Sequence, residues 1–161
     1  LCAASPGKLR SLLRRVLPPP AASVQRDVQH ILDALDEVYK TYGYYLAYVQ
    51  SIELTGADAM EKAANMMANL RANVPETIGG VPVTVVRDYR SSVAKDMVSG
   101  AESTINLPKS NVLEFVLGDK GSVIARPSGT EPKVKFYYTA VAEDKAAAKS
   151  LLDAMVAQMS K

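Results

Sequence analysis

The stretch RPSGTEPK, residues 126–133, lies between two apolar runs that are typical of β-strands. Pro127 favours an extended conformation at Arg126, and Gly129 can adopt a positive φ that lets successive backbone N–H groups converge. Ser128 and Thr130 add hydroxyl donors, and the planar guanidinium of Arg126 matches two phosphate oxygens at once. The pattern predicts a loop that binds phosphate, although Pro, Ser, Gly and Thr are also common in plain hairpin turns.

Hydrophobic periodicity on both sides of this loop predicts an ordered succession of elements. A strand is expected over residues 44–54, a helix from about 58 to 73, and a second strand from about 81 to 88. Residues 90–110 are polar and lack periodicity, so we expect an irregular excursion there. Residues 112–117 and 122–126 predict a hairpin that leads into the loop, followed by a strand around 134–138 and a final helix from about 143 to 159. The predicted order is strand, helix, four strands, helix.

Composition restricts the classes of protein to which the chain can belong. Of 161 residues, 48% are hydrophobic and 22% are charged, which is typical of one globular domain. Residues 24–161 hold 15 basic and 17 acidic side chains, a balance that argues against a nucleic-acid-binding surface. Cys2 is the single cysteine, which favours a reducing, cytoplasmic setting. No apolar run approaches the roughly 18 residues of a membrane span, so we expect no membrane contact.

The N-terminal part of the chain divides into two segments. Residues 1–23 are basic, contain Pro18-Pro19-Pro20 and start with Leu1 instead of methionine. We expect them to be a disordered lead or sequence added during cloning, on a piece of a longer protein. From Val24 to Tyr42 apolar residues recur at three- and four-residue spacing, which predicts a helix that Gly43 ends.

Three segments of the chain resemble one enzyme family. Residues 126–135, RPSGTEPKVK, resemble the C-terminal signature of the α-D-phosphohexomutases, and the similarity extends to LDEVYKTYGYY at 35–45 and LPKSNVL at 107–113. The family contains the phosphoglucomutases and phosphomannomutases, which have four domains. The resemblance, which we place over residues 31–161, implies that 24–42 is a helix left from the end of the preceding domain. It also implies that 43–161 is the C-terminal phosphate-binding domain.

Together with the element order, the resemblance implies an α+β fold. We expect a two-layer sandwich in which a four- to five-stranded, mainly antiparallel sheet carries two helices on one face. The resemblance further implies that Arg126, Ser128, Gly129 and Thr130 bind the substrate phosphate. Glu131 and Lys135 are secondary candidates that could contact sugar hydroxyls or phosphate, orient Arg126, or merely occupy the sheet surface.

The reaction that the resemblance implies is the interconversion of hexose 1-phosphate and hexose 6-phosphate through a bisphosphate. The expected partners are hexose phosphates and the missing domains of the same enzyme, which require Mg²⁺ and a hexose bisphosphate activator. The phosphorylated serine and the metal ligands belong to those earlier domains, so this chain is expected to contain no catalytic or metal-binding residue and to be inactive alone. A phosphoglucomutase is favoured; a phosphomannomutase and a non-catalytic anion-binding or structural domain are the alternatives.

Overall fold

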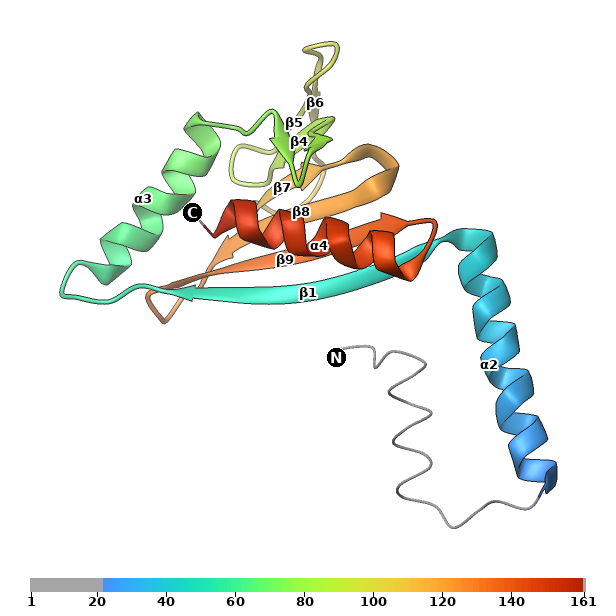
Figure 1. The fold of residues 1–161 in the computed structure, drawn as a ribbon. Helices are drawn as coiled ribbons and strands as arrows, with labels where there is room; N and C mark the ends of the chain where they lie inside the picture. Colours follow the sequence, from blue (N-terminus) through green and yellow to red (C-terminus); the bar gives the residue numbers. More distant parts are fainter. Residues whose placement is uncertain (1–21, 161) are drawn as a thin grey trace.

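The computed structural model describes residues 22–160 of the chain, and the expectation for residues 1–21 lies outside them. A sheet and two covering helices form two layers, and a further helix extends away from them (Figure 1). In chain order the elements are α2 (Ala22–Tyr42), β1 (Tyr44–Glu53), α3 (Ala59–Ala72), β2 (Thr77–Ile78), β3 (Val81–Pro82), β4 (Val85–Asp88), β5 (Val93–Asp96), β6 (Glu102–Thr104), β7 (Leu113–Val116), a 3₁₀ turn (Gly118–Lys120), β8 (Gly121–Pro127), β9 (Lys133–Ala142) and α4 (Lys145–Met159).

The main sheet has seven strands in the order β1-β9-β8-β7-β4-β5-β6, and every neighbouring pair is antiparallel. The predicted α+β class and antiparallel sheet are confirmed. The predicted count of four to five strands is wrong, because residues 90–110 contribute β5 and β6 instead of an irregular excursion. These strands pair through their backbones, and their side chains remain exposed or half-buried. Because neither strand buries one of its faces, their sequences show no alternation of apolar and polar residues.

The hydrophobic core lies on one face of the sheet. Along β9, Val134, Phe136, Tyr138 and Ala140 are 0–1% exposed, whereas the residues between them point to the other face and are less buried. Met67 of α3 and Met155 of α4 join the same buried cluster as these side chains. Both helices therefore cover the same face, as predicted. No helix of residues 22–160 covers the opposite face, which we call the uncovered face (Figure 1).

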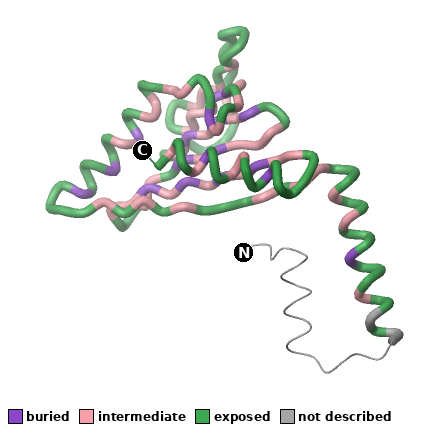
Figure 2. The backbone as a smooth tube through the Cα atoms, viewed as in Figure 1, coloured by how far each residue is buried: buried purple, intermediate pink, exposed green. Residues whose placement is uncertain are grey.

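Helix α2 stands apart from the sandwich (Figure 1) and is exposed along most of its length (Figure 2). It begins two residues before the predicted start at Val24 and ends at Tyr42, as predicted. Gly43, with a φ of 84°, then leads the chain into β1. The rings of Tyr39 and Tyr44 stack across this turn with centroids 4.6 Å apart. No helix within the described residues has the length and apolarity needed to cross a membrane.

Candidate functional site

The predicted phosphate loop connects β8 to β9 and is closed by its own hydrogen bonds. The Ser128 N–H donates to the Lys133 carbonyl at 2.8 Å, and the Lys133 N–H donates to the Glu131 carbonyl at 2.8 Å. The Ser128 Oγ accepts from the Glu131 N–H at 3.3 Å. These hydrogen bonds, which involve the backbone at the strand ends and the Ser128 side chain, hold the loop in a defined shape.

Two backbone donors at the tip of this loop remain available. Within residues 22–160, the N–H groups of Gly129 and Thr130 and the Thr130 hydroxyl have no hydrogen-bond partner, and both residues are exposed. The expectation that Gly129 adopts a positive φ is wrong, because it is absent from the residues with that conformation. The Ser128 side chain closes the turn, so the loop does not require a left-handed residue.

Arg126 and Lys135 lie directly opposite each other in the β8–β9 register, and Ser51 of β1 lies on the other side of Lys135. Their neighbours Ala125 and Phe136 point into the core, so Arg126 and Lys135 project from the uncovered face. Neither cation makes a hydrogen bond or salt bridge within the described residues. Two adjacent cations that form no salt bridge create a surface that favours an anion.

Glu131 pairs with Lys133 and not with Arg126. The Lys133 Nζ lies 2.6 Å from Glu131 Oε2, and the Lys133 side chain is only 19% exposed. The hydrogen bond from Lys133, followed by its charge, holds the pKa of Glu131 below the ordinary value, with a smaller contribution from Lys135. The hydrogen bond to Glu131 likewise raises the pKa of Lys133, against a smaller lowering by desolvation. The one carboxylate in the loop therefore leaves Arg126 uncompensated.

The six candidate residues all lie on β8, the loop or β9. Residues that are adjacent in the sequence are not always neighbours in the structure. It places Arg126 beside Lys135, and it places Gly129 and Thr130 at the exposed tip. The Ser128 hydroxyl already accepts a hydrogen bond within the loop. Sequence reasoning missed Lys133 as the partner of Glu131, although an acid and a lysine two residues apart at a turn could have indicated the pair.

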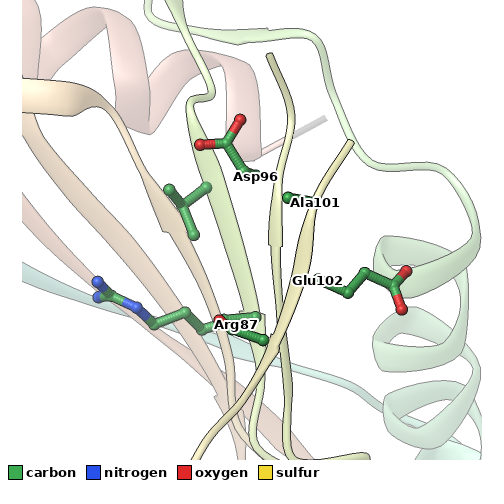
Figure 3. A pocket seen from close by; sticks show the side chains of 7 residues that line it. Arg87, Asp96, Ala101 and Glu102 are labelled. Carbon is green, nitrogen blue, oxygen red and sulfur yellow. The ribbon is translucent and has the colours of Figure 1, made fainter. Parts of the chain in front are cut away.

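A separate hollow of about 310 Å³ lies over β4, β5 and β6 (Figure 3). Its charged side chains already have partners or point elsewhere: Arg87 forms a 3.2 Å salt bridge with Glu114, and Glu102 points away from the hollow in Figure 3. Asp96 accepts hydrogen bonds from the N–H groups of Ser99 at 2.7 Å and Val98 at 2.9 Å. The Ser99 bonds are the main cause of its lowered pKa. The hollow is therefore a weaker candidate than the loop.

No group of three or more His, Cys, Asp or Glu side chains in the part of the chain that the structure describes could hold a metal ion.

Comparisons with known proteins identify one family. The model for the C-terminal domain of phosphoglucomutase/phosphomannomutase matches residues 57–158. The phosphoglucomutase of Staphylococcus aureus strain bovine RF122 / ET3-1 is 40% identical over 105 residues, which are 65% of this chain and 19% of that protein. The phosphoglucomutase of Staphylococcus aureus strain MSSA476 is 39% identical over 105 residues, again 65% of this chain and 19% of that protein. The match thus spans about a fifth of the length of these relatives.

A solved structure is also similar. It is the open form of the exocytosis-sensitive phosphoprotein pp63/parafusin (phosphoglucomutase) from Paramecium, which aligns with a TM-score of 0.45 and 14% identity over 78% of this chain and 22% of that one.

Proposed function

Because this chain belongs to the phosphoglucomutase/phosphomannomutase family and corresponds to its C-terminal domain, we propose that it binds the phosphate group of a hexose phosphate within a phosphohexose mutase. The observation that carries this proposal is the adjacent pair Arg126 and Lys135, two cations of which neither forms a salt bridge within the described residues. The free N–H groups of Gly129 and Thr130 lie in the loop that joins their strands. Such a set is suited to a dianion.

Each candidate residue has a separate part in this proposal. The Arg126 guanidinium supplies a planar pair of donors, and Lys135 supplies a second positive charge from the neighbouring strand. Gly129 and Thr130 contribute donors at the tip, while Ser128 maintains the loop shape through its bond with Glu131. Glu131 acts indirectly, by holding Lys133. This assigns phosphate contact to Lys135 and a supporting role to Glu131, the two roles that the sequence left open.

The proposed role in the reaction is positioning. In a mutase that moves a phosphoryl group between the C1 and C6 oxygens of one hexose, the phosphate that does not react must be held while the other end reacts. Donors that recognise the phosphate, and not one face of the sugar, can hold it in both orientations. Positioning and charge stabilisation supply most of the catalysis of phosphoryl transfer, and this domain contributes a part of the positioning.

We also propose a division of the chain into domains and a location in the cell. Residues 43–161 are the C-terminal phosphate-binding domain, and 24–42 are a helix that belongs to the end of the preceding domain. The phosphoryl-carrying serine and Mg²⁺ belong to other domains, so the chain alone binds substrate without turning it over. The names of the relatives favour glucose phosphates over mannose phosphates, and the single cysteine favours the cytoplasm.

A purely structural turn is the second candidate function. Two observations favour it: Gly129 does not use its conformational freedom, and the Ser128 hydroxyl is engaged within the loop. On this alternative the loop only connects β8 to β9.

Amide chemical shifts in an NMR titration of the 161-residue chain distinguish the two functions. Glucose 6-phosphate and glucose 1-phosphate should shift the amides of Gly129 and Thr130, and free glucose should not. Arg126→Ala should abolish the shifts, whereas Lys120→Ala, at the opposite end of β8, should preserve them. Equal shifts with glucose and its phosphates, or no shift at the loop, would favour the structural turn.

A further inference from the structure

The two edges of the main sheet differ in the way they are protected. At one edge β6 has only three residues and begins with Glu102, features that discourage pairing with another chain. At the other edge β1 has ten residues, Tyr44–Glu53. It pairs with β9 on one side, and no strand within residues 22–160 pairs with its other side. A strand of this length is about 33 Å long and presents its backbone groups to any complementary strand.

The side chains of β1 do not protect it. The strand contains no Lys, Arg or Pro, and its one charged residue is Glu53 at its end. Tyr45 is 59% exposed and Val49 is 51% exposed. Helix α4 lies over a face of the sheet, where Gln50 Nε2 donates to Ser160 Oγ at 2.8 Å, and it leaves the edge uncovered (Figure 1). Within residues 22–160, β1 therefore shows none of the usual devices against edge pairing.

We propose that β1 pairs antiparallel with β1 of a second copy of this chain, about a twofold axis at Ala47. This register places Tyr45 opposite the partner's Val49, and by symmetry Val49 opposite the partner's Tyr45. Both residues project from the uncovered face of the sheet. Pairs of an aromatic with a β-branched side chain are favourable at directly opposed positions.

The remaining side chains of β1 are compatible with this register. On the other face, Leu46 lies opposite the partner's Tyr48, and the overlap extends over residues 44–50. Glu53 remains outside the overlap, so no carboxylates oppose each other. An axis at Tyr48 instead places Tyr45 opposite the partner's Ser51, and an axis at Val49 places Tyr45 opposite the partner's Glu53. Of these axes, only the one at Ala47 places the two large exposed apolar side chains of the uncovered face, Tyr45 and Val49, opposite each other.

The expected dimer is weak. The overlapping part of each strand buries much less than the roughly 1,600 Å² of a standard interface, so we expect a dissociation constant on the order of tens of micromolar. The proposed interface does not include the loop between β8 and β9. Dimer formation and phosphate binding are therefore independent of each other.

Sedimentation velocity of the full chain provides the test, over a range from about 5 to about 500 µM that brackets the expected constant. The wild-type chain should shift from monomer towards dimer. Ala47→Lys and Ala47→Glu each place like charges opposite each other at the axis, so each variant should remain monomeric. An equimolar mixture of the two variants should recover the dimer, because the introduced ammonium group of one chain then opposes the introduced carboxylate of the other.

Two controls make the test specific. Ser103→Lys adds the same charge at the β6 edge and should associate like the wild type. Ile31→Glu, on the exposed part of α2, should also leave the dimer unchanged. A wild-type chain that is monomeric throughout the range overturns the proposal, as does association that survives both Ala47 variants. Loss of the dimer in Ile31→Glu would assign the interface to α2 and likewise overturn the proposal.

Discussion

Arg126 and Lys135 are direct cross-strand partners on β8 and β9, and both project from the uncovered face of the sheet. Like charges at opposed positions of a sheet are unfavourable, and in the described residues neither cation forms a salt bridge. A bound dianion would convert this repulsion into attraction. We therefore predict that the pair slightly destabilises the free protein and that bound phosphate would stabilise it.

Replacing Lys135 should separate these two effects. We expect Lys135→Ala to raise the free energy of unfolding by about 0.2–1 kcal/mol, because it removes the opposition of like charges. The same substitution should weaken the binding of glucose 6-phosphate. Urea denaturation and isothermal titration calorimetry measure the two quantities. Lys120→Ala is the matched control, and a variant with lower stability and unchanged affinity would contradict the assignment of Lys135.

Arg126→Lys retains the positive charge but loses the planar pair of donors. Since a charge-assisted hydrogen bond contributes about 1.5–3 kcal/mol, we expect the dissociation constant for glucose 6-phosphate to rise about 10- to 100-fold. In the complete enzyme kcat/KM should fall by a similar factor. The melting temperature should remain that of the wild type, because Arg126 is exposed. A loss of activity that follows a loss of stability would instead indicate a structural turn.

Two glycines near the ends of β8 should respond in opposite ways to alanine. A Cβ added at Gly129 would enter open space, with no atom within 4 Å, and the φ of this residue is not positive. We expect Gly129→Ala to change the free energy of unfolding by at most about 1 kcal/mol, in the stabilising direction. At Gly121 a Cβ would lie 1.9 Å from the Thr139 carbonyl oxygen, and φ is 124°. Gly121→Ala should therefore unfold at a clearly lower temperature. Equal melting temperatures would contradict the loop geometry.

The Glu131–Lys133 pair should make a pH-dependent contribution to stability. The pKa of Glu131 is lowered by the hydrogen bond from Lys133, so its contribution is present above the ordinary pKa and is lost as the pH falls through the lowered value. The pKa of Lys133 is raised by the hydrogen bond to Glu131, so its contribution is present below the ordinary pKa and is lost as the pH rises through the raised value.

NMR titration of the Glu131 carboxyl carbon measures this prediction. In the wild-type chain the carboxyl should titrate below its ordinary value of 4.5. In Lys133→Met the titration should move upward towards that value, because the principal cause of the shift is removed. Lys120→Met serves as the control and should leave the Glu131 titration unchanged. An unshifted carboxyl in the wild-type chain would show that the pair does not persist in solution.

Removal of residues 1–42 should have little effect on the sandwich. The buried cluster that joins the sheet to α3 and α4 contains no residue of α2, and the described contacts at the junction are the Tyr39–Tyr44 stack and the hydrogen bond from the Gly43 N–H to the Tyr39 carbonyl. We expect the shortened chain to melt within a few degrees of the full chain, a shift that corresponds to about 1 kcal/mol or less. Calorimetry of both chains provides the comparison, and failure of the shortened chain to fold would show that α2 belongs to the core.

The sequence by itself determined the elements that have a local signal. Alternation of apolar residues from Val134 to Tyr138 predicted β9, and the polar stretch before it predicted the connecting loop and its family. The strands β5 and β6 were missed, because side chains that remain largely exposed or half-buried leave no apolar period in the sequence.

Only the tertiary structure decided which residues face each other. The opposition of Arg126 and Lys135 depends on the register of β8 against β9, and a shift of one residue would send one of the two side chains into the core. The unpaired edge of β1 depends on the pairing of Tyr44–Glu53 with β9, a strand that lies far later in the chain. Contacts of this range follow from the packing of the whole sheet, because local periodicity specifies which face a side chain occupies and not which strand lies beside it.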